Sequence, residues 1–399
     1  MSPRLALTLT LACAAALSAT AQVVSGRIVD AADSSGVGYA AVGLPGTSSG
    51  TVANELGEFV IDAGGADSLL VYHLNYGTTV HALPGGSSPL VIALASRPFA
   101  LAEVVVSDVS ARDALNAAIE RSAEALTLPA QLRTYYREFV KVNDTYTKYA
   151  DGLVNYVVGR RGKSKLKIKA YVEDSRAAFL DDAGDAGELS EINTVLDVSD
   201  APAFMLVARE VDFTNPDQQG HYDFERYVRR DGGTSVTLIK AIPKAGVGER
   251  LYGGQVVIDD ATGLLREVTV DLSPAHRAYG KTVNLLVLKA DVLDARKRLV
   301  FDAGGPGYHL AYALLSQTLR LYNGKGVDET FAFTSDLVVT DVLPHASSTP
   351  VAGEAYGKRA LYKREAAPRT AFWRGARAMK LTPEQERVVA ALQGEAGEE

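Results

Sequence analysis

The sequence predicts a mainly β protein: a small N-terminal β-sandwich, a connecting α-helix, a larger antiparallel sheet or half-barrel, and a C-terminal helix. Residues 23–96 break into short Val- and Thr-rich runs separated by glycine-containing turns, and residues 134–342 carry longer runs in which polar and apolar residues alternate. Helical spacing of apolar residues appears at about 111–126 and again after Thr382. Short, evenly spaced strands are typical of a sandwich, and alternation is typical of a sheet with one solvated face.

The N-terminus has the features of a secretory signal peptide. Arg4 precedes the apolar run Leu5–Leu17, and Ala19-Thr20-Ala21 supplies the small-residue cleavage site before Gln22. The run is too short to cross a bilayer, and no later stretch approaches the roughly 18 apolar residues of a transmembrane helix. We therefore expect an exported protein, in the periplasm or associated with the outer membrane, with no transmembrane span.

Cys13 is the only cysteine. The alternative is a lipoprotein signal that is cut before Cys13. Such a signal has an aliphatic and a small residue where this chain has Thr10 and Leu11, so cleavage after Ala21 is the preferred expectation. That cleavage removes Cys13, and the mature chain then has no disulfide and no thiolate for catalysis or metal binding.

Composition and charge bound the function. Apolar residues make up 47% and charged residues 22%, as in ordinary globular proteins, and the net charge of −7 argues against nucleic acid as the main partner. We expect a signal peptide at 1–21, a sandwich with its connector at 22–106, a helical linker at 107–133, a large β domain at 134–345, and a basic tail with a short helix at 346–399.

The residues of the first β-rich part carry a family resemblance. Its marks are Gly26, Ala40-Ala41-Val42 leading to Gly46, Gly50-Thr51, and the turn Asn54-Glu55-Leu56-Gly57-Glu58 followed by Phe59. Together they resemble the carboxypeptidase regulatory-like domain at the front of many Bacteroidota envelope proteins, including TonB-dependent receptors. The family usually has Asp where Asn54 stands. The resemblance implies a transthyretin-like sandwich that serves folding or interaction and has no chemistry of its own.

Two helices are predicted outside the sheets. Around 111–126, Leu115, Ile119, Ser122 and Leu126 form one stripe, with Ser110 as the N-cap and Pro129 beyond the end. This segment and the RTYYREFVK run after it resemble a larger Bacteroidota family of regulatory-domain proteins of unknown function. Near the C-terminus, Thr382-Pro383-Glu384-Gln385 spells a capping box before Val388, Val389 and Leu392.

The large β domain lacks the apolar band and aromatic girdles of a lipid-facing barrel. Its strands are charged on one face and apolar on the other, which favours one curved antiparallel sheet whose concave side could hold something apolar.

Catalytic and metal motifs do not survive inspection. Gly46-Thr47-Ser48-Ser49-Gly50 matches G-x-S-x-G, but it lies between two strands with no helix after it, so a structural turn is expected. Ser164-Lys165-Leu166-Lys167 matches S-x-x-K in a strand-like segment without partner motifs. The six histidines show no zinc spacing; His221, near Asp217 and Asp223, is the least implausible ligand. Acids at Asp181-Asp182, at Asp259-Asp260 and between Glu173 and Asp200 form no calcium loop and are expected in turns or solvent.

Basic residues provide the clearest candidate surface. With strand period two, Lys163, Lys165, Lys167 and Lys169 line one face, while Leu166 and Ile168 point to the other, and Arg160 and Arg161 precede them. The residues that we expect to bind are therefore Arg160, Arg161, Lys163, Lys165, Lys167 and Lys169. Two roles are open for these residues: protection of an edge strand, or docking to anionic lipid or an acidic protein. Bases and aromatics at 358–380 suit a membrane surface, or a tail packed on the protein's own acidic loop.

These observations predict a non-enzymatic cell-envelope protein that acts by contact with an envelope protein or an anionic lipid surface. No catalytic residue, metal site or cofactor is predicted. Two alternatives remain open: a hydrolase in which His221 or His276 meets carboxylates in one cleft of the large β domain, and a carrier of lipid or lipoprotein with an apolar cavity under the sheet.

Overall fold

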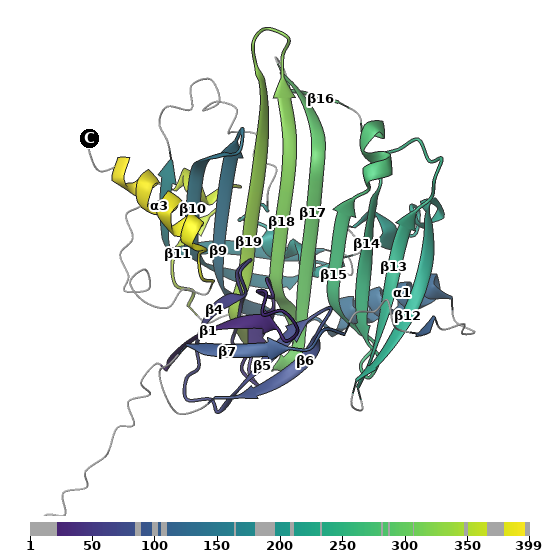
Figure 1. The fold of residues 1–399 in the computed structure, drawn as a ribbon, viewed down its shortest axis with the longest axis vertical. Helices are drawn as coiled ribbons and strands as arrows, with labels where there is room; N and C mark the ends of the chain where they lie inside the picture. The colour runs from purple at the N-terminus through teal and green to yellow at the C-terminus, as the bar shows by residue number, and fades with distance from the viewer. Residues whose placement is uncertain are drawn as a thin grey trace, which may run out of the picture.

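The computed structural model confirms a mainly β protein with a large open antiparallel sheet (Figure 1). It describes residues 22–83, 89–97, 103–104, 110–162, 165–179, 196–207, 211–231, 234–280, 282–285, 288–305, 307–346, 350–364 and 379–395. The predicted signal peptide, Cys13, Lys163, Ser164 and the acids Asp181-Asp182 lie outside the described residues.

The N-terminal unit is a sandwich of two small sheets. A 3-stranded sheet has the order β4-β1-β7 and a 4-stranded sheet has the order β3-β2-β5-β6. The strands are β1 (Val23–Asp30), β2 (Ala41–Gly43), β3 (Gly50–Val52), β4 (Glu58–Asp62), β5 (Ser68–His73), β6 (Gly77–Ala82) and β7 (Leu90–Leu94). Ile28, Phe59 and Leu69, all 0% exposed, lie in the core between the two sheets, where their burial supplies the main stabilising term.

The turn before β4 has the conformation expected from its glycine. Gly57 has φ of +78°, and a Cβ there would lie 2.2 Å from the Ile28 carbonyl oxygen. Both the backbone conformation and this steric clash therefore exclude a side chain. Asn54 is fully buried, and its Oδ1 accepts hydrogen bonds from the amides of Leu56 and Glu58. The segment Asn54–Glu58, called here the docking turn, is therefore a rigid feature of the sandwich.

The large sheet has 13 strands, paired antiparallel, in the order β20-β11-β10-β9-β19-β18-β17-β15-β14-β13-β12-β8, with β16 paired to β17. Its elements are β8 (Glu103–Val104), β9 (Ala130–Val142), β10 (Thr145–Arg160), β11 (Leu166–Phe179), β12 (Tyr222–Asp231), β13 (Thr234–Pro243), β14 (Tyr252–Asp259), β15 (Leu264–Leu272), β16 (Val283–Leu285), β17 (Leu288–Gly305), β18 (Gly307–Tyr322), β19 (Asp328–Pro344) and β20 (Glu354–Tyr356). The connector and the tail thus each add a short strand to an edge of the sheet.

The remaining elements cover the sheet from two sides. They are α1 (Ala111–Ala125), α3 (Pro383–Glu395) and the 3₁₀ turns η2 (Ala201–Met205), η4 (Asp212–Thr214), η5 (Gln219–His221), η6 (Pro274–Tyr279) and η7 (Leu361–Lys363). Figure 1 shows the sandwich and α3 in front of the sheet and α1 behind it. We call the face that packs on α1 the inner face and the face that packs on the sandwich the outer face.

The inner face carries the main core. Leu115 and Ile119 of α1, Phe213 of η4 and Leu361 of η7 join one cluster with the apolar side chains of the strands. Phe213 is 0% exposed and sits on Gly254, where a Cβ would lie 2.7 Å from its ring. Most of the described inner face is therefore filled by side chains.

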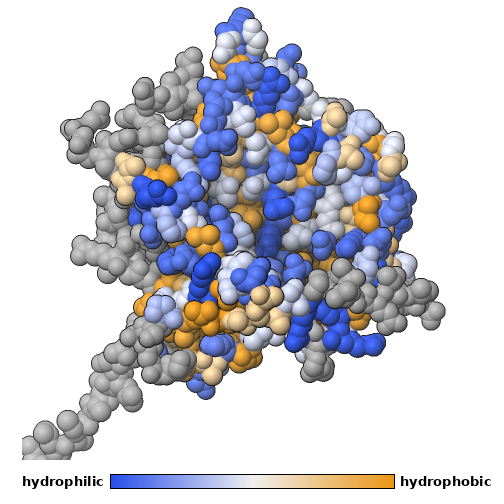
Figure 2. Space-filling model, in the orientation of Figure 1, coloured by the Kyte–Doolittle hydropathy of each residue, from blue (hydrophilic) through white to orange (hydrophobic). Residues whose placement is uncertain are grey.

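One part of the outer face is open to solvent, and the sandwich and α3 cover the rest. Exposed ion pairs such as Arg296–Asp271 occupy its open part, and Figure 2 shows hydrophilic residues over most of this view. Hydrophobic residues gather on the sandwich, where Val80 and Val91 are 62% and 68% exposed. The expected solvated face is thus present over its open part, and the sandwich and α3 cover the rest.

The N-cap of α1 confirms the sequence prediction and carries a test. The Asp113 amide donates to the Ser110 hydroxyl at 3.1 Å. We expect Ser110→Ala to lower the free energy of unfolding by about 1 kcal/mol, because one amide of the first turn loses its acceptor. Urea denaturation of both proteins measures this, and Ser110→Asp, which restores an acceptor, should recover most of the loss.

Candidate functional site

The predicted basic stripe is exposed on β11. Lys165, Lys167 and Lys169 are exposed, while Leu166 and Ile168 pack against the inner core, as the alternation predicts. β20 pairs with β11 only at Ala170–Val172, so the lysines flank a stretch with an open strand edge.

Arg160 has a different place. Its guanidinium donates to the carbonyl oxygens of Ala123 and Glu124, the latter at 3.4 Å, at the end of α1. It thereby satisfies carbonyls that the helix leaves unpaired, and its role in binding stays a prediction. Arg161, in the following turn, is exposed and stays with the lysines.

His276 and His73 have structural surroundings. His276 is buried, its Nδ1 lies 2.9 Å from the Ser273 hydroxyl, and its Nε2 lies 3.1 Å from the Lys244 carbonyl. Burial lowers the pKa of His73 to about 4, which keeps its ring neutral. Within the described ranges, no three His, Cys, Asp or Glu side chains lie close enough together to hold a metal ion.

The two motif matches in described segments are turns. Ser48, of the G-x-S-x-G spelling, lies in the hairpin between β2 and β3; its hydroxyl donates to Asp341 at 3.1 Å and accepts from the Val342 amide at 3.1 Å. The hydroxyl thus fastens the sandwich to β19. Asp259 accepts hydrogen bonds from the amides of Ala261 and Thr262, as expected for a turn aspartate.

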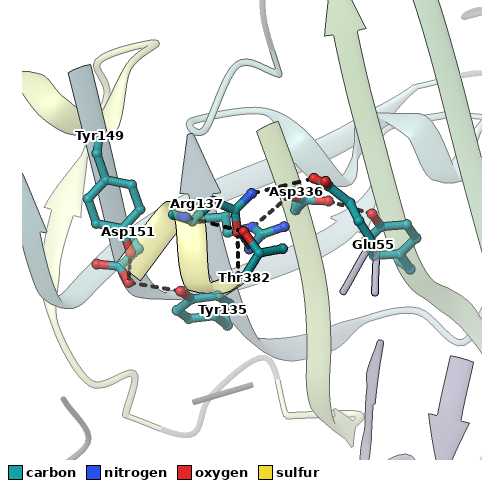
Figure 3. Close-up of polar contacts among 9 residues, drawn as sticks. Glu55, Tyr135, Arg137, Tyr149, Asp151, Asp336 and Thr382 are labelled. Atoms are coloured by element: carbon teal, nitrogen blue, oxygen red, sulfur yellow. Dashed lines mark hydrogen bonds and ion pairs between the residues drawn. The ribbon is translucent and has the colours of Figure 1, made fainter. Parts of the chain in front are cut away.

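A row of charged side chains, missed by the sequence analysis, crosses the outer face beneath the sandwich and α3 (Figure 3). Arg176, Asp151, Arg137 and Asp336 stand directly opposite one another on β11, β10, β9 and β19. Arg176 Nε donates to Asp151 at 2.7 Å, and Arg137 Nε donates to Asp336 at 2.7 Å. These side chains are at most 8% exposed, so we call them the buried charge row.

Tyrosines complete the buried charge row. Tyr135 and Tyr149 donate to Asp151, and Tyr312 donates to Asp336. Burial and then the neighbouring carboxylates raise the pKa of Tyr135 and Tyr312 far above the usual range, so both remain protonated donors. Burial opposes the charge of Arg137, but Asp336 outweighs it and raises the pKa of Arg137.

The C-terminal helix closes the buried charge row. The capping box is confirmed: the Gln385 amide donates to the Thr382 hydroxyl at 3.2 Å, and the Thr382 amide donates to Gln385 Oε1 at 3.0 Å. Gln385 also contacts Arg137 at 3.5 Å and Glu55 of the docking turn at 3.4 Å. Lys380 pairs with Glu58 at 3.2 Å. The row therefore joins three parts of the chain and is closed to substrate.

Glu138, on the opposite face of β9, holds the tail against the inner face. Its carboxylate accepts from the Tyr362 amide and from the Tyr136 hydroxyl, both at 2.8 Å. Burial raises the pKa of Glu138 to about 7, because desolvation outweighs these hydrogen bonds. Nearby, Arg359 of the tail pairs with Asp197 at 3.2 Å. This ion pair favours the interpretation that the described part of the tail packs on the protein's own acidic residues.

A cavity of about 350 Å³ lies on the inner face. Val211 and Asp212 form one side, and β14, β15, β17 and β18 form the other. Its apolar wall comes from Val211, Tyr252, Val270, Ala295 and Leu315, and its polar residues include Asp212, Lys297 and Gln317. Neither His221 nor His276 lines it. The lining is therefore partly apolar and partly polar.

The described helices include none with the length and hydrophobicity needed to cross a bilayer.

Comparisons with known proteins give distant similarities. No protein-family model and no curated protein matches the sequence. MucB, solved in complex with the periplasmic part of MucA, is 9% identical, with 59% of this chain and 99% of MucB covered at a TM-score of 0.21. A DUF1329 family protein from Desulfovibrio piger is 9% identical over 60% of this chain and 96% of its own, with a TM-score of 0.28. A LolA superfamily protein from Nitrosomonas europaea is 12% identical over 61% and 98%, with a TM-score of 0.21. Superpositions this loose establish neither a shared family nor a shared function.

Proposed function

We infer that this protein is an exported, non-catalytic binding protein of the cell envelope that holds a small amphiphile in the inner-face cavity. The cavity carries this proposal. Its volume of about 350 Å³ falls at the small end of the range in which proteins bind small molecules. The N-terminal resemblance and the signal sequence support an envelope location.

The lining gives the ligand class. Val270 and Leu315 offer apolar contact from the sheet, while Asp212, Lys297 and Gln317 offer polar groups in the same cavity. A molecule with a short apolar part and a polar end satisfies both kinds of lining, since an apolar ligand alone would leave the polar groups desolvated.

Filling the cavity should weaken binding. We expect 1-anilinonaphthalene-8-sulfonate to fluoresce on binding and to be displaced by decanoate. Leu315→Trp puts a large ring into the cavity. The ligand then loses contacts equivalent to about two methylene groups, which weakens binding about tenfold. Fluorescence titration measures the dissociation constants.

The matched control is Val283→Trp on β16, where the side chain is 46% exposed and lies outside the cavity. Ala295→Leu, a smaller insertion into the same cavity, repeats the test if Leu315→Trp shifts the urea midpoint. Equal affinity of the wild type, the control and both cavity variants would refute the proposal.

A further inference from the structure

We propose that Arg161, Lys165, Lys167 and Lys169, called the basic row, form a docking surface for an anionic lipid bilayer. This proposal is independent of the inner-face cavity and rests on the geometry and pairing of these four side chains.

The first argument is alignment. Lys165, Lys167 and Lys169 alternate with residues that face the core, so all three project from the same side of the β11 segment. Alternate residues of a strand are roughly 7 Å apart, and the three ammonium groups therefore project from a line roughly 13 Å long. Three cations that project from the same side of one segment can meet an anionic surface together.

The second argument is pairing. Elsewhere on the surface, arginines that flank acids pair with them, as Arg320 does with Asp328 at 2.6 Å and Arg359 with Asp197 at 3.2 Å. None of the four cations of the basic row makes an ion pair with any residue in the described ranges, although the chain has 48 acids against 41 lysines and arginines. Within the described ranges these four charges are not neutralised by an acid, and we assign an anionic lipid surface as their partner.

The basic row also suits edge protection, because charged side chains keep an open strand edge from pairing with another chain. The two roles make different demands. Edge protection needs charge of either sign, whereas docking needs positive charge. Reversing the sign therefore separates them.

The test is sedimentation of the purified protein with vesicles of phosphatidylcholine, alone or mixed with phosphatidylglycerol. We expect the wild type to bind the mixed vesicles and to lose binding as salt rises from about 0.1 M to about 1 M, where the screening length falls to about 3 Å. Each cation near an anionic leaflet contributes about fivefold in affinity, so Lys165→Glu/Lys167→Glu/Lys169→Glu should weaken binding by about 100-fold or more.

The matched control is Arg230→Glu/Lys289→Glu/Lys325→Glu, which changes the net charge equally at three exposed and dispersed positions. It should bind mixed vesicles within a few-fold of the wild type. Size-exclusion chromatography should find the row variant with the same elution volume as the wild type, because the edge is still charged. Wild-type protein that ignores phosphatidylglycerol, or equal losses in both triple variants, would overturn the proposal, as would a row variant that oligomerises while its vesicle binding is intact.

Discussion

Asp336→Ala is expected to lower the free energy of unfolding by about 3 to 5 kcal/mol, the larger of the two main predicted effects. Arg137 is 2% exposed and Asp336 is 1% exposed. Removing the carboxylate leaves the guanidinium buried without its ionic partner and removes the acceptor of the Tyr312 hydroxyl. Urea unfolding monitored by circular dichroism measures the loss.

The exposed pair Arg320–Asp328 is the matched control. Its N···O distance of 2.6 Å is similar, but the two side chains are 47% and 58% exposed. We expect Asp328→Ala to change the free energy of unfolding far less, because solvent screens the charges of this exposed pair. The double variant Arg137→Met/Asp336→Leu should recover much of the loss, since replacing both charges leaves no unpaired charge and only the Tyr312 hydroxyl still lacks its acceptor. If Asp336→Ala cost no more than Asp328→Ala, the buried charge row would not hold the domains together as described.

Glu138 should make the protein less stable as the pH rises. Its pKa is raised from 4.5 to about 7 in the folded chain. The folded state therefore binds a proton that the unfolded state has already released, and this contribution is complete below pH 4.5 and lost as the pH passes 7. The shift corresponds to about 3 kcal/mol in total, of which about 2 to 3 kcal/mol is lost between about pH 5 and 8.

Glu138→Gln isolates this contribution. A neutral amide can accept from the Tyr362 amide and donate to the Tyr136 oxygen, while the Tyr136 hydroxyl donates to the Leu196 carbonyl, which lies 3.1 Å away. We expect the variant to be about 3 kcal/mol more stable than the wild type at pH 8 and within about 1 kcal/mol of it at pH 5. Glu249→Gln, at an exposed position, is the control. Parallel pH profiles for Glu138→Gln and the wild type would show that Glu138 is ionised in the folded chain.

Local sequence patterns predicted most elements because these elements are stabilised locally. The Ser110 cap, the Thr382 capping box and the Gly57 turn depend on contacts within a few residues, and each is present as expected. The alternation of β11 likewise placed Lys165, Lys167 and Lys169 on one exposed face.

Strand β18 was not predicted, because both its faces are buried. Tyr312 and Leu314 pack under the sandwich, while Ala313 and Leu310 join the inner core. A strand covered on both sides loses the period-two alternation by which it would be recognised. β3 and β12 were also missed, the former because it has 3 residues.

The buried charge row could not be predicted from one strand at a time. Arg137 and Asp151 are charged residues within strands and therefore look solvent-exposed in sequence. They are buried because α3 and the docking turn, more than 200 residues apart along the chain, close over them. The available signal was a charge at the centre of each of several apolar strands, and its meaning depends on the register of β9, β10, β11 and β19.

The binding proposal is tested most directly by crystallising the protein with 11-bromoundecanoate and locating the bromine by anomalous scattering. We expect the bromine peak between Val211 and Leu315, with the carboxylate near Lys297 or Gln317. A cavity that stays free of the probe at saturating concentration, with bromine found elsewhere or nowhere, would contradict the account.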